Sequence, residues 1–194
     1  MRKWNVVVMA LLMLVACKNA GDSAANAEQA GQISKSKFYS AAVKDTFAIE
    51  VYVPPVLHQQ ANKKFPVVYL LDGNLYFDVM AATFKKYSEV GLLAPAILVG
   101  IGYKDFRTMD SLRDRDYTFP VAIPEYEMRA SGKADNFLNL LTQQIIPYVD
   151  SHFPTDTGNR TLMGHSLGGY FTLYALQQAL VMQRRLFDTY IAAS

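Results

Sequence analysis

A serine flanked by glycines is the feature of this sequence most able to do chemistry. Gly164 and Gly168 lie two positions either side of Ser166, with His165 and Leu167 between, which fits the pattern G-x-S-x-G. In a sharp turn from a strand into a helix, side chains at the two outer positions would collide, so both are glycine. Such a turn exposes the hydroxyl at a helix N-terminus, where negative charge is stabilised. The pattern therefore predicts a nucleophilic serine.

A nucleophilic serine also needs hydrogen-bond donors for the oxyanion that forms on the carbonyl it attacks. The backbone N–H of Leu167 is the first expected donor, because it directly follows the serine. The second should come from the loop after an earlier central strand, where the sequence reads Leu-Leu-Asp-Gly-Asn. We expect the N–H of Asn74 or Gly73 to donate there, with Gly73 allowing close approach to a substrate. A plain turn is the alternative, since Asp-Gly-Asn is a common turn sequence.

The serine needs a base and an acid to activate it, and all three histidines of the chain precede it. His165 belongs to the turn and is expected to point away from the hydroxyl. His58 is expected in a surface loop, and His152 at the opposite end of the sheet. Asp188, the only acid after the serine, is expected at the surface. We therefore expect the base and acid to lie beyond the last residue, which would make the chain incomplete, inactive as given and poorly stable.

The elements that must hold these groups alternate between short apolar runs and longer helical patterns. Unbroken apolar runs indicate strands buried on both faces, and strands that alternate with helices indicate an α/β fold with a mostly parallel sheet. Asp135 is a plausible N-cap, and residues 103–133 are predicted to form a functional loop or cap. We expect strands at 47–53, 67–71, 95–102, 160–163 and 188–194, and helices at 135–153 and 169–185.

These stretches resemble the putative-esterase family of α/β-hydrolases, and the siderophore-esterase-like branch most of all. The matching segments follow in the family's order: FPVVYLLDGN, PAILVGIGY, RDRDYTFP, FLNLLTQQIIPYVDSHF, RTLMGHSLGGYFTLYAL and FDTYIAAS. The resemblance implies an α/β-hydrolase fold, a mostly parallel central sheet flanked by helices, with the last strands and helix missing. It implies Ser166 as nucleophile, and Leu167 and Asn74 as oxyanion donors.

A short charged segment matches the family less closely. Arg113, Arg115 and Asp116 resemble the R-x-R-D-Y-T-P loop that family members carry near the site. Here Phe119 separates the threonine from the proline, where relatives usually join them. Two interpretations stay open for the three charged residues: a substrate loop, or a surface ion-pair cluster.

The N-terminus predicts a bacterial lipoprotein. Residues 1–17 read as a signal peptide whose apolar run of 11 residues is too short to span a bilayer. It ends in LVAC, which resembles a lipobox and implies lipidation of Cys17, the only cysteine. We expect 18–36 to be a flexible tether and 37–194 an α/β-hydrolase domain on the periplasmic side of the outer membrane, in the cell envelope. An ordinary secretory leader cut after Ala27 is the alternative.

The composition argues against one class of function, the binding of nucleic acid. The formal net charge is +2, with no basic stripe, which argues against nucleic acid as a partner. No cofactor and no metal are expected. We expect a serine hydrolase that acts on small-molecule carboxylic esters through an acyl-enzyme, with the membrane as partner through its lipid anchor. The alternatives are a non-catalytic binding lipoprotein on the same scaffold and an acyltransferase.

Overall fold

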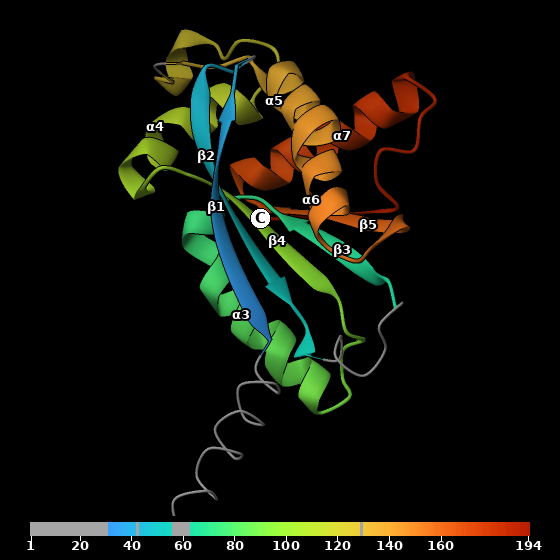
Figure 1. Ribbon diagram of the computed structural model, residues 1–194. Helices are drawn as coiled ribbons and strands as arrows, with labels where there is room; N and C mark the ends of the chain where they lie inside the picture. The colour runs from blue at the N-terminus through green and yellow to red at the C-terminus, as the bar shows by residue number, and fades with distance from the viewer. Residues whose placement is uncertain (1–30, 42, 56–62, 129) are drawn as a thin grey trace, which may run out of the picture.

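The computed structural model describes residues 31–41, 43–55, 63–128 and 130–194 (Figure 1). Cys17 and His58 lie outside these residues, and so do the signal peptide and most of the predicted tether. Lipidation of Cys17 therefore stays a prediction. Within the described residues, no helix combines the length and the apolar composition needed to cross a bilayer.

The described residues form a six-stranded sheet in the order β1-β2-β4-β3-β5-β6. β1 pairs antiparallel with β2 and β2 antiparallel with β4, whereas β4, β3, β5 and β6 run parallel. This confirms the mixed α/β fold with a mostly parallel sheet. The strands are β1 (Gln32–Ser40), β2 (Asp45–Val53), β3 (Phe65–Leu70), β4 (Ile97–Tyr103), β5 (Thr155–His165) and β6 (Thr189–Ala193).

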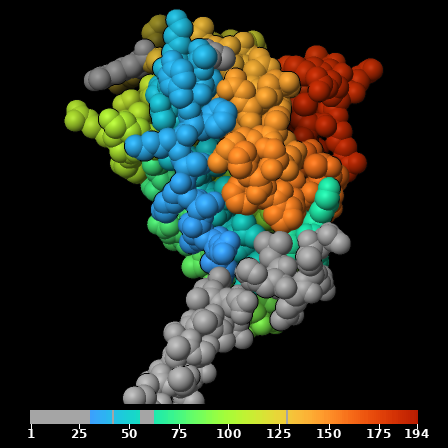
Figure 2. Space-filling view, viewed as in Figure 1, coloured from blue at the N-terminus to red at the C-terminus, as the bar shows by residue number. Residues whose placement is uncertain are grey.

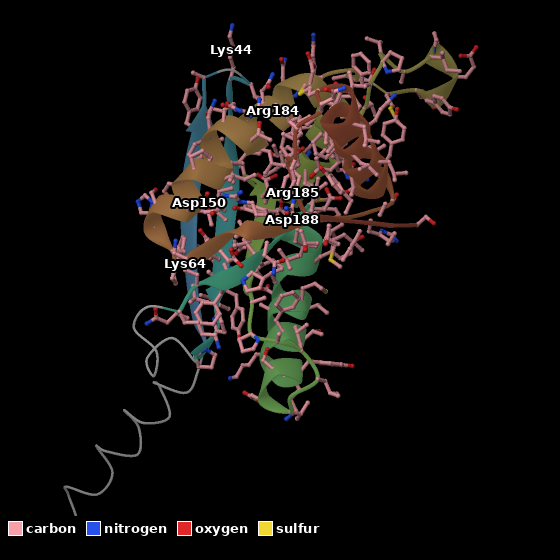
Figure 3. The ribbon with its side chains drawn as sticks, turned by 90° about the vertical axis from the view of Figure 1, so that its right-hand side faces the viewer. Lys44, Lys64, Asp150, Arg184, Arg185 and Asp188 are labelled. Carbon is pink, nitrogen blue, oxygen red and sulfur yellow. The ribbon has the colours of Figure 1, made fainter. Side chains whose placement is uncertain are left out.

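Helices cover both faces of the sheet, with α3 on one face and α4 to α7 on the other (Figures 1 and 3). Successive strand residues point to opposite faces, so alternate residues feed two separate apolar clusters. The larger cluster packs β2, β3 and β4 against α4 to α7, and the smaller packs them against α3. The helices are α3 (Gly73–Glu89), α4 (Phe106–Tyr117), the 3₁₀ turn η2 (Pro124–Tyr126), α5 (Ala134–Leu140), the π-turn η3 (Leu141–Ile145), α6 (Ile146–His152) and α7 (Leu167–Val181).

The predicted helix at 135–153 is present, but it begins one residue earlier and changes its winding midway. Lys133 takes the N-cap position, and Asp135 lies in the first turn, where its negative charge still favours the helix. The π-turn η3 directly precedes α6, in which Pro147 has no N–H to donate to the preceding turn. The change of winding accommodates that missing hydrogen bond.

Two sequence predictions about boundaries are wrong. β1 begins at Gln32, so the described end of the predicted tether is strand and the domain starts before residue 37. β1 is an edge strand, largely exposed and visible on the surface in Figure 2, and its polar residues therefore resembled a linker. The segment 103–133 is not simply irregular either, because it contains α4. Asp105 caps this helix by accepting a hydrogen bond from the Thr108 N–H at 2.7 Å.

Candidate active site

Ser166 lies between the end of β5 and the start of α7, at the carboxyl edge of the parallel strands. Its φ of 56° and ψ of −122° are strained for a residue with a side chain. Two hydrogen bonds hold the strained backbone: its N–H donates to the Ala193 carbonyl at 2.8 Å, and its carbonyl accepts from the Tyr170 N–H at 3.0 Å. Ser166 is exposed, so the turn presents its hydroxyl to solvent.

The glycines around the serine are required by close backbone contacts. A Cβ at Gly164 would lie 2.2 Å from the Gly168 carbonyl oxygen, which is the collision that the spacing predicts. A Cβ at Gly168 would lie 3.2 Å from the Asp72 carboxylate. Gly169, to which the sequence assigned no role, is also constrained, because a Cβ there would lie 2.6 Å from the Ala193 carbonyl oxygen. Gly164 and Gly169 thus exclude a larger residue unless the turn opens, and the contact at Gly168 is tight.

The loop after β3 reaches the same edge of the sheet as the serine turn. β3 and β5 are parallel neighbours, and the Leu71 N–H donates to the Met163 carbonyl at 2.9 Å. One turn into α3, the Tyr76 hydroxyl lies 3.0 Å from Nδ1 of His165. The structure therefore brings the two segments on which the sequence placed the oxyanion donors next to Ser166.

The two candidate donors in this loop differ in exposure. Gly73 is buried, and a Cβ there would lie 3.1 Å from the backbone of Gly100 in β4. This corrects the reason given for Gly73, since the glycine allows α3 to approach β4. Asn74 is exposed, and its side chain exchanges two hydrogen bonds with the backbone of Tyr103, at 2.6 and 3.0 Å. Asn74 and Leu167 lie in the first turns of α3 and α7, where backbone N–H groups have no partner within the helix.

None of the described histidines contacts the Ser166 hydroxyl. His165 faces Tyr76, with ring centroids 5.7 Å apart. His152 bonds to the Tyr148 carbonyl at 2.8 Å and sits before the start of β5, whereas Ser166 follows its end. Eleven strand residues separate these ends, a length of about 35 Å. Both imidazoles are thus engaged away from the Ser166 hydroxyl.

Asp188 has a structural role at the start of β6. Its carboxylate accepts from the Arg160 N–H at 2.5 Å, and its own N–H donates to the Arg160 carbonyl at 2.8 Å. It also forms an ion pair with Arg185, and Figure 3 shows the two side by side. These contacts join β6 to β5, well before the carboxyl end where the serine lies.

The strained residue at the start of α3 is held by a buried ion pair. Asp72 has a left-handed backbone with φ of 53°, and it is fully buried. Arg113 binds its carboxylate at two points, at 3.2 and 2.8 Å, and the Asp72 N–H donates to the Tyr117 hydroxyl at 3.3 Å. Burial by itself would lower the pKa of Arg113, but the hydrogen bond and charge of Asp72 outweigh it and raise the pKa. The two-point contact between Arg113 and Asp72 fixes the loop that carries Asn74.

Arg115 and Asp116 belong to a second buried network on α4. The guanidinium of Arg115 binds Asp116 at 2.7 and 2.9 Å and reaches Asp45 at 3.3 Å, while the Tyr103 hydroxyl donates to Asp116 at 3.1 Å. Burial raises the pKa of Asp116, and the positive charge of Arg115 offsets part of that rise. The ion pairs foreseen for this segment exist, but they lie on the helix α4, and they join partly exposed guanidiniums to buried carboxylates. Because Asp116 is 0% exposed, it does not contact a bound substrate.

The sequence reasoning missed the part played by Asp72. An acid directly after a buried strand was the available signal, because a buried carboxylate requires a partner.

No group of three or more potential metal ligands lies close together in the part of the chain that the structure describes.

The sheet order, the strained serine turn and the adjoining loop after β3 define an α/β-hydrolase. A family profile described as "Putative esterase" matches residues 40–185, and the chain belongs to this family. The chain is 33% identical over 141 residues to the ferri-bacillibactin esterase BesA of Bacillus subtilis, an alignment that covers 67% of this chain and 47% of the relative. It thus spans about half the length of the curated relatives it matches.

Solved structures of similar proteins have the same fold. The BES protein from Bacillus cereus superposes with a TM-score of 0.71 at 29% identity, covering 83% of this chain and 60% of that one. The siderophore hydrolase EstA from Aspergillus nidulans superposes with a TM-score of 0.67 at 26% identity, covering 82% and 57%. The chain therefore shares its fold with proteins that are named as esterases or hydrolases.

Proposed function

We propose that Ser166 is the nucleophile of a carboxylic-ester hydrolase. The observation that carries the proposal is the strained serine turn, with φ of 56° and an exposed side chain. Strain of this kind persists where the surrounding structure holds it, and it clusters at active sites. A binding protein on the same scaffold would have little use for it.

In the proposed reaction, Oγ of Ser166 attacks the ester carbonyl carbon. The N–H groups of Leu167 and Asn74 donate to the oxygen on which negative charge develops. The C–O bond to the alcohol breaks, the alcohol leaves with the proton that the hydroxyl lost, and an acyl-enzyme remains. Water then releases the acid and restores the serine. The base that carries the proton is not a described histidine, as their contacts indicate.

The substrate in this proposal is a small-molecule ester. Several relatives are named as siderophore esterases, so siderophore esters form one class to assay.

We further propose that the protein is held at the cell envelope by lipid on Cys17, because the lone cysteine ends an apolar run. A signal-peptidase-II inhibitor should then change the mobility of the precursor. Unchanged processing with a mature end at Glu28 would contradict the anchor.

The proposed nucleophile can be tested with a fluorophosphonate probe, which reacts with activated serines. Protein that carries the expected base and acid should be labelled, and peptide mass spectrometry should place the adduct on Ser166. The Ser166→Ala variant should lose the label, because removing such a nucleophile can cost about a million-fold in rate.

Ser111 provides a matched control, since it is another exposed serine whose hydroxyl bonds only to the Arg107 carbonyl of its own helix. The Ser111→Ala variant should be labelled like the parent. Equal labelling of the parent and the Ser166→Ala variant would show that Ser166 is not the nucleophile.

A further inference from the structure

An apolar cavity opens beside the serine turn. Its volume is about 420 Å³, which is within the usual range of small-molecule pockets. Residues 118–128 form one wall, and Leu167 and Tyr170 of α7 form the other. Leu167 directly follows Ser166, and Tyr170 lies one helical turn after it, so the cavity begins within one turn of the serine.

The outer wall belongs to a loop whose ends are joined by hydrogen bonds. The Thr118 hydroxyl accepts from the Gly132 N–H at 2.7 Å, and the Thr118 carbonyl accepts from the Ala134 N–H at 3.1 Å. Within the loop, the Ala122 N–H donates to the Ser131 hydroxyl at 2.9 Å. Compact surface loops with adjoining ends are frequently functional. These bonds make the wall a fixed part of the fold.

Large apolar side chains around this cavity remain exposed to solvent. A contiguous group of exposed apolar side chains rimming a hollow marks an interaction site. Their exposure ranges from 45% to 69% and is shared by Phe119, Val121, Ile123, Tyr126 and Tyr170.

Two of the hydroxyl groups that line the cavity are already engaged. The Tyr170 hydroxyl donates to the Phe119 carbonyl at 2.5 Å, and the Thr118 hydroxyl donates to the Asp114 carbonyl at 2.6 Å. No charged side chain is among the described residues that line the cavity. The cavity therefore offers mainly hydrocarbon surface to whatever enters it.

We infer that this cavity binds an uncharged hydrocarbon group, alkyl or aryl, of the ester whose carbonyl lies at Ser166. The placement of the carbonyl rests on the proposed function, whereas the cavity does not. Phe119, which breaks the family's loop pattern, lines the wall and packs on Tyr174 with ring centroids 5.4 Å apart. Phe119, the residue that departs from the family's pattern, thus lies in the cavity wall, where it would influence which substrate binds.

The test measures binding without catalysis, in the Ser166→Ala variant. The neutral fluorophore N-phenyl-1-naphthylamine is bound to the protein and displaced by methyl ketones of increasing chain length, from 2-butanone to 2-decanone. Affinity should rise about fourfold per methylene until the cavity is full, because each methylene leaves water. The anion hexanoate should bind more weakly than 2-heptanone, since a carboxylate finds no partner on this wall.

Two variants with equally exposed side chains locate the binding. Val121→Asp places a charge in the cavity wall and should lower ketone affinity at least tenfold. Leu92→Asp changes a residue that is 73% exposed, against 69% for Val121, and lies outside the cavity, so it should leave affinity unchanged. If Val121→Asp fails to fold, Phe119→Ala removes part of the wall without adding charge and should also weaken binding.

Affinity that does not change with chain length, or that falls equally in the two aspartate variants, would overturn the inference. Chain-length dependence without any fluorophosphonate adduct on Ser166, in protein that carries the expected base and acid, would leave the cavity assigned and refute the nucleophile instead. An adduct on Ser166 without chain-length dependence would support the nucleophile and refute the assignment of the cavity.

Discussion

At the residue scale, the site depends on two strained backbone positions, Ser166 and Asp72. Each has a positive φ and each directly precedes a helix. Ser166 is held by main-chain hydrogen bonds and by glycines that leave no room for side chains. Asp72 is held by Arg113 and Tyr117. The geometry around the proposed oxyanion thus depends on an ion pair between residues 41 positions apart in the sequence.

The first prediction concerns this buried pair. Replacing Arg113 by methionine keeps the length of the side chain but leaves the carboxylate of Asp72 buried and unpaired. Losing one partner of a buried pair costs about 3–5 kcal/mol, so urea unfolding should report a loss of that size.

The matched control removes both charges. Asn tolerates the left-handed backbone, so Asp72→Asn combined with Arg113→Met should recover much of the stability that the single change removes. A single Arg113→Met variant as stable as the parent would show that the pair does not hold the loop.

At the element scale, α3 has two tasks. It covers one face of the sheet, and its first turn carries Asn74, the proposed second oxyanion donor. Phe77 anchors it, since the side chain is fully buried and a Cβ at Gly100 would lie 2.6 Å from its ring. β4 has a glycine at position 100 because the Phe77 ring of α3 packs directly against the backbone there.

The second prediction tests this anchor. Phe77→Ala should lower the free energy of unfolding by about 3–5 kcal/mol, the usual cost of removing a buried aromatic side chain. Leu75→Ala lies on the same helix but is 43% exposed, so it should change stability by roughly 0.5 kcal/mol or less. Equal losses in the two variants would mean that α3 is not fixed through Phe77.

Some elements could be predicted from the sequence and others could not. β3, β4 and α7 carry strong apolar runs, and the serine turn carries its glycines, so local patterns were sufficient there. α4 was missed because its charged residues form ion pairs with Asp72 and Asp45, which lie far away in the sequence. β1 was missed because its side chains are mostly exposed, and its pairing with β2 rather than its own residues makes it a strand.

At the scale of the whole molecule, the parallel strands gather segments distant in sequence at one edge. The loop after β3, the turn after β5 and the cavity wall at 118–128 come from three separate parts of the chain. The sequence predicted the first two as a site, because each follows a strand. The cavity was not predicted, since it exists only where the loop and α7 meet.

The measurement that tests the central claim most directly is detection of the acyl-enzyme. The protein is mixed with 4-nitrophenyl acetate, quenched in acid and digested, and the acetylated peptide is located by mass spectrometry. In protein that carries the expected base and acid, we predict an acetyl group on Ser166 of the parent and of the Ser111→Ala variant, and none at this position in Ser166→Ala. Acetylation confined to other residues, or none above the level of the denatured chain, would contradict the assignment of Ser166 as the nucleophile.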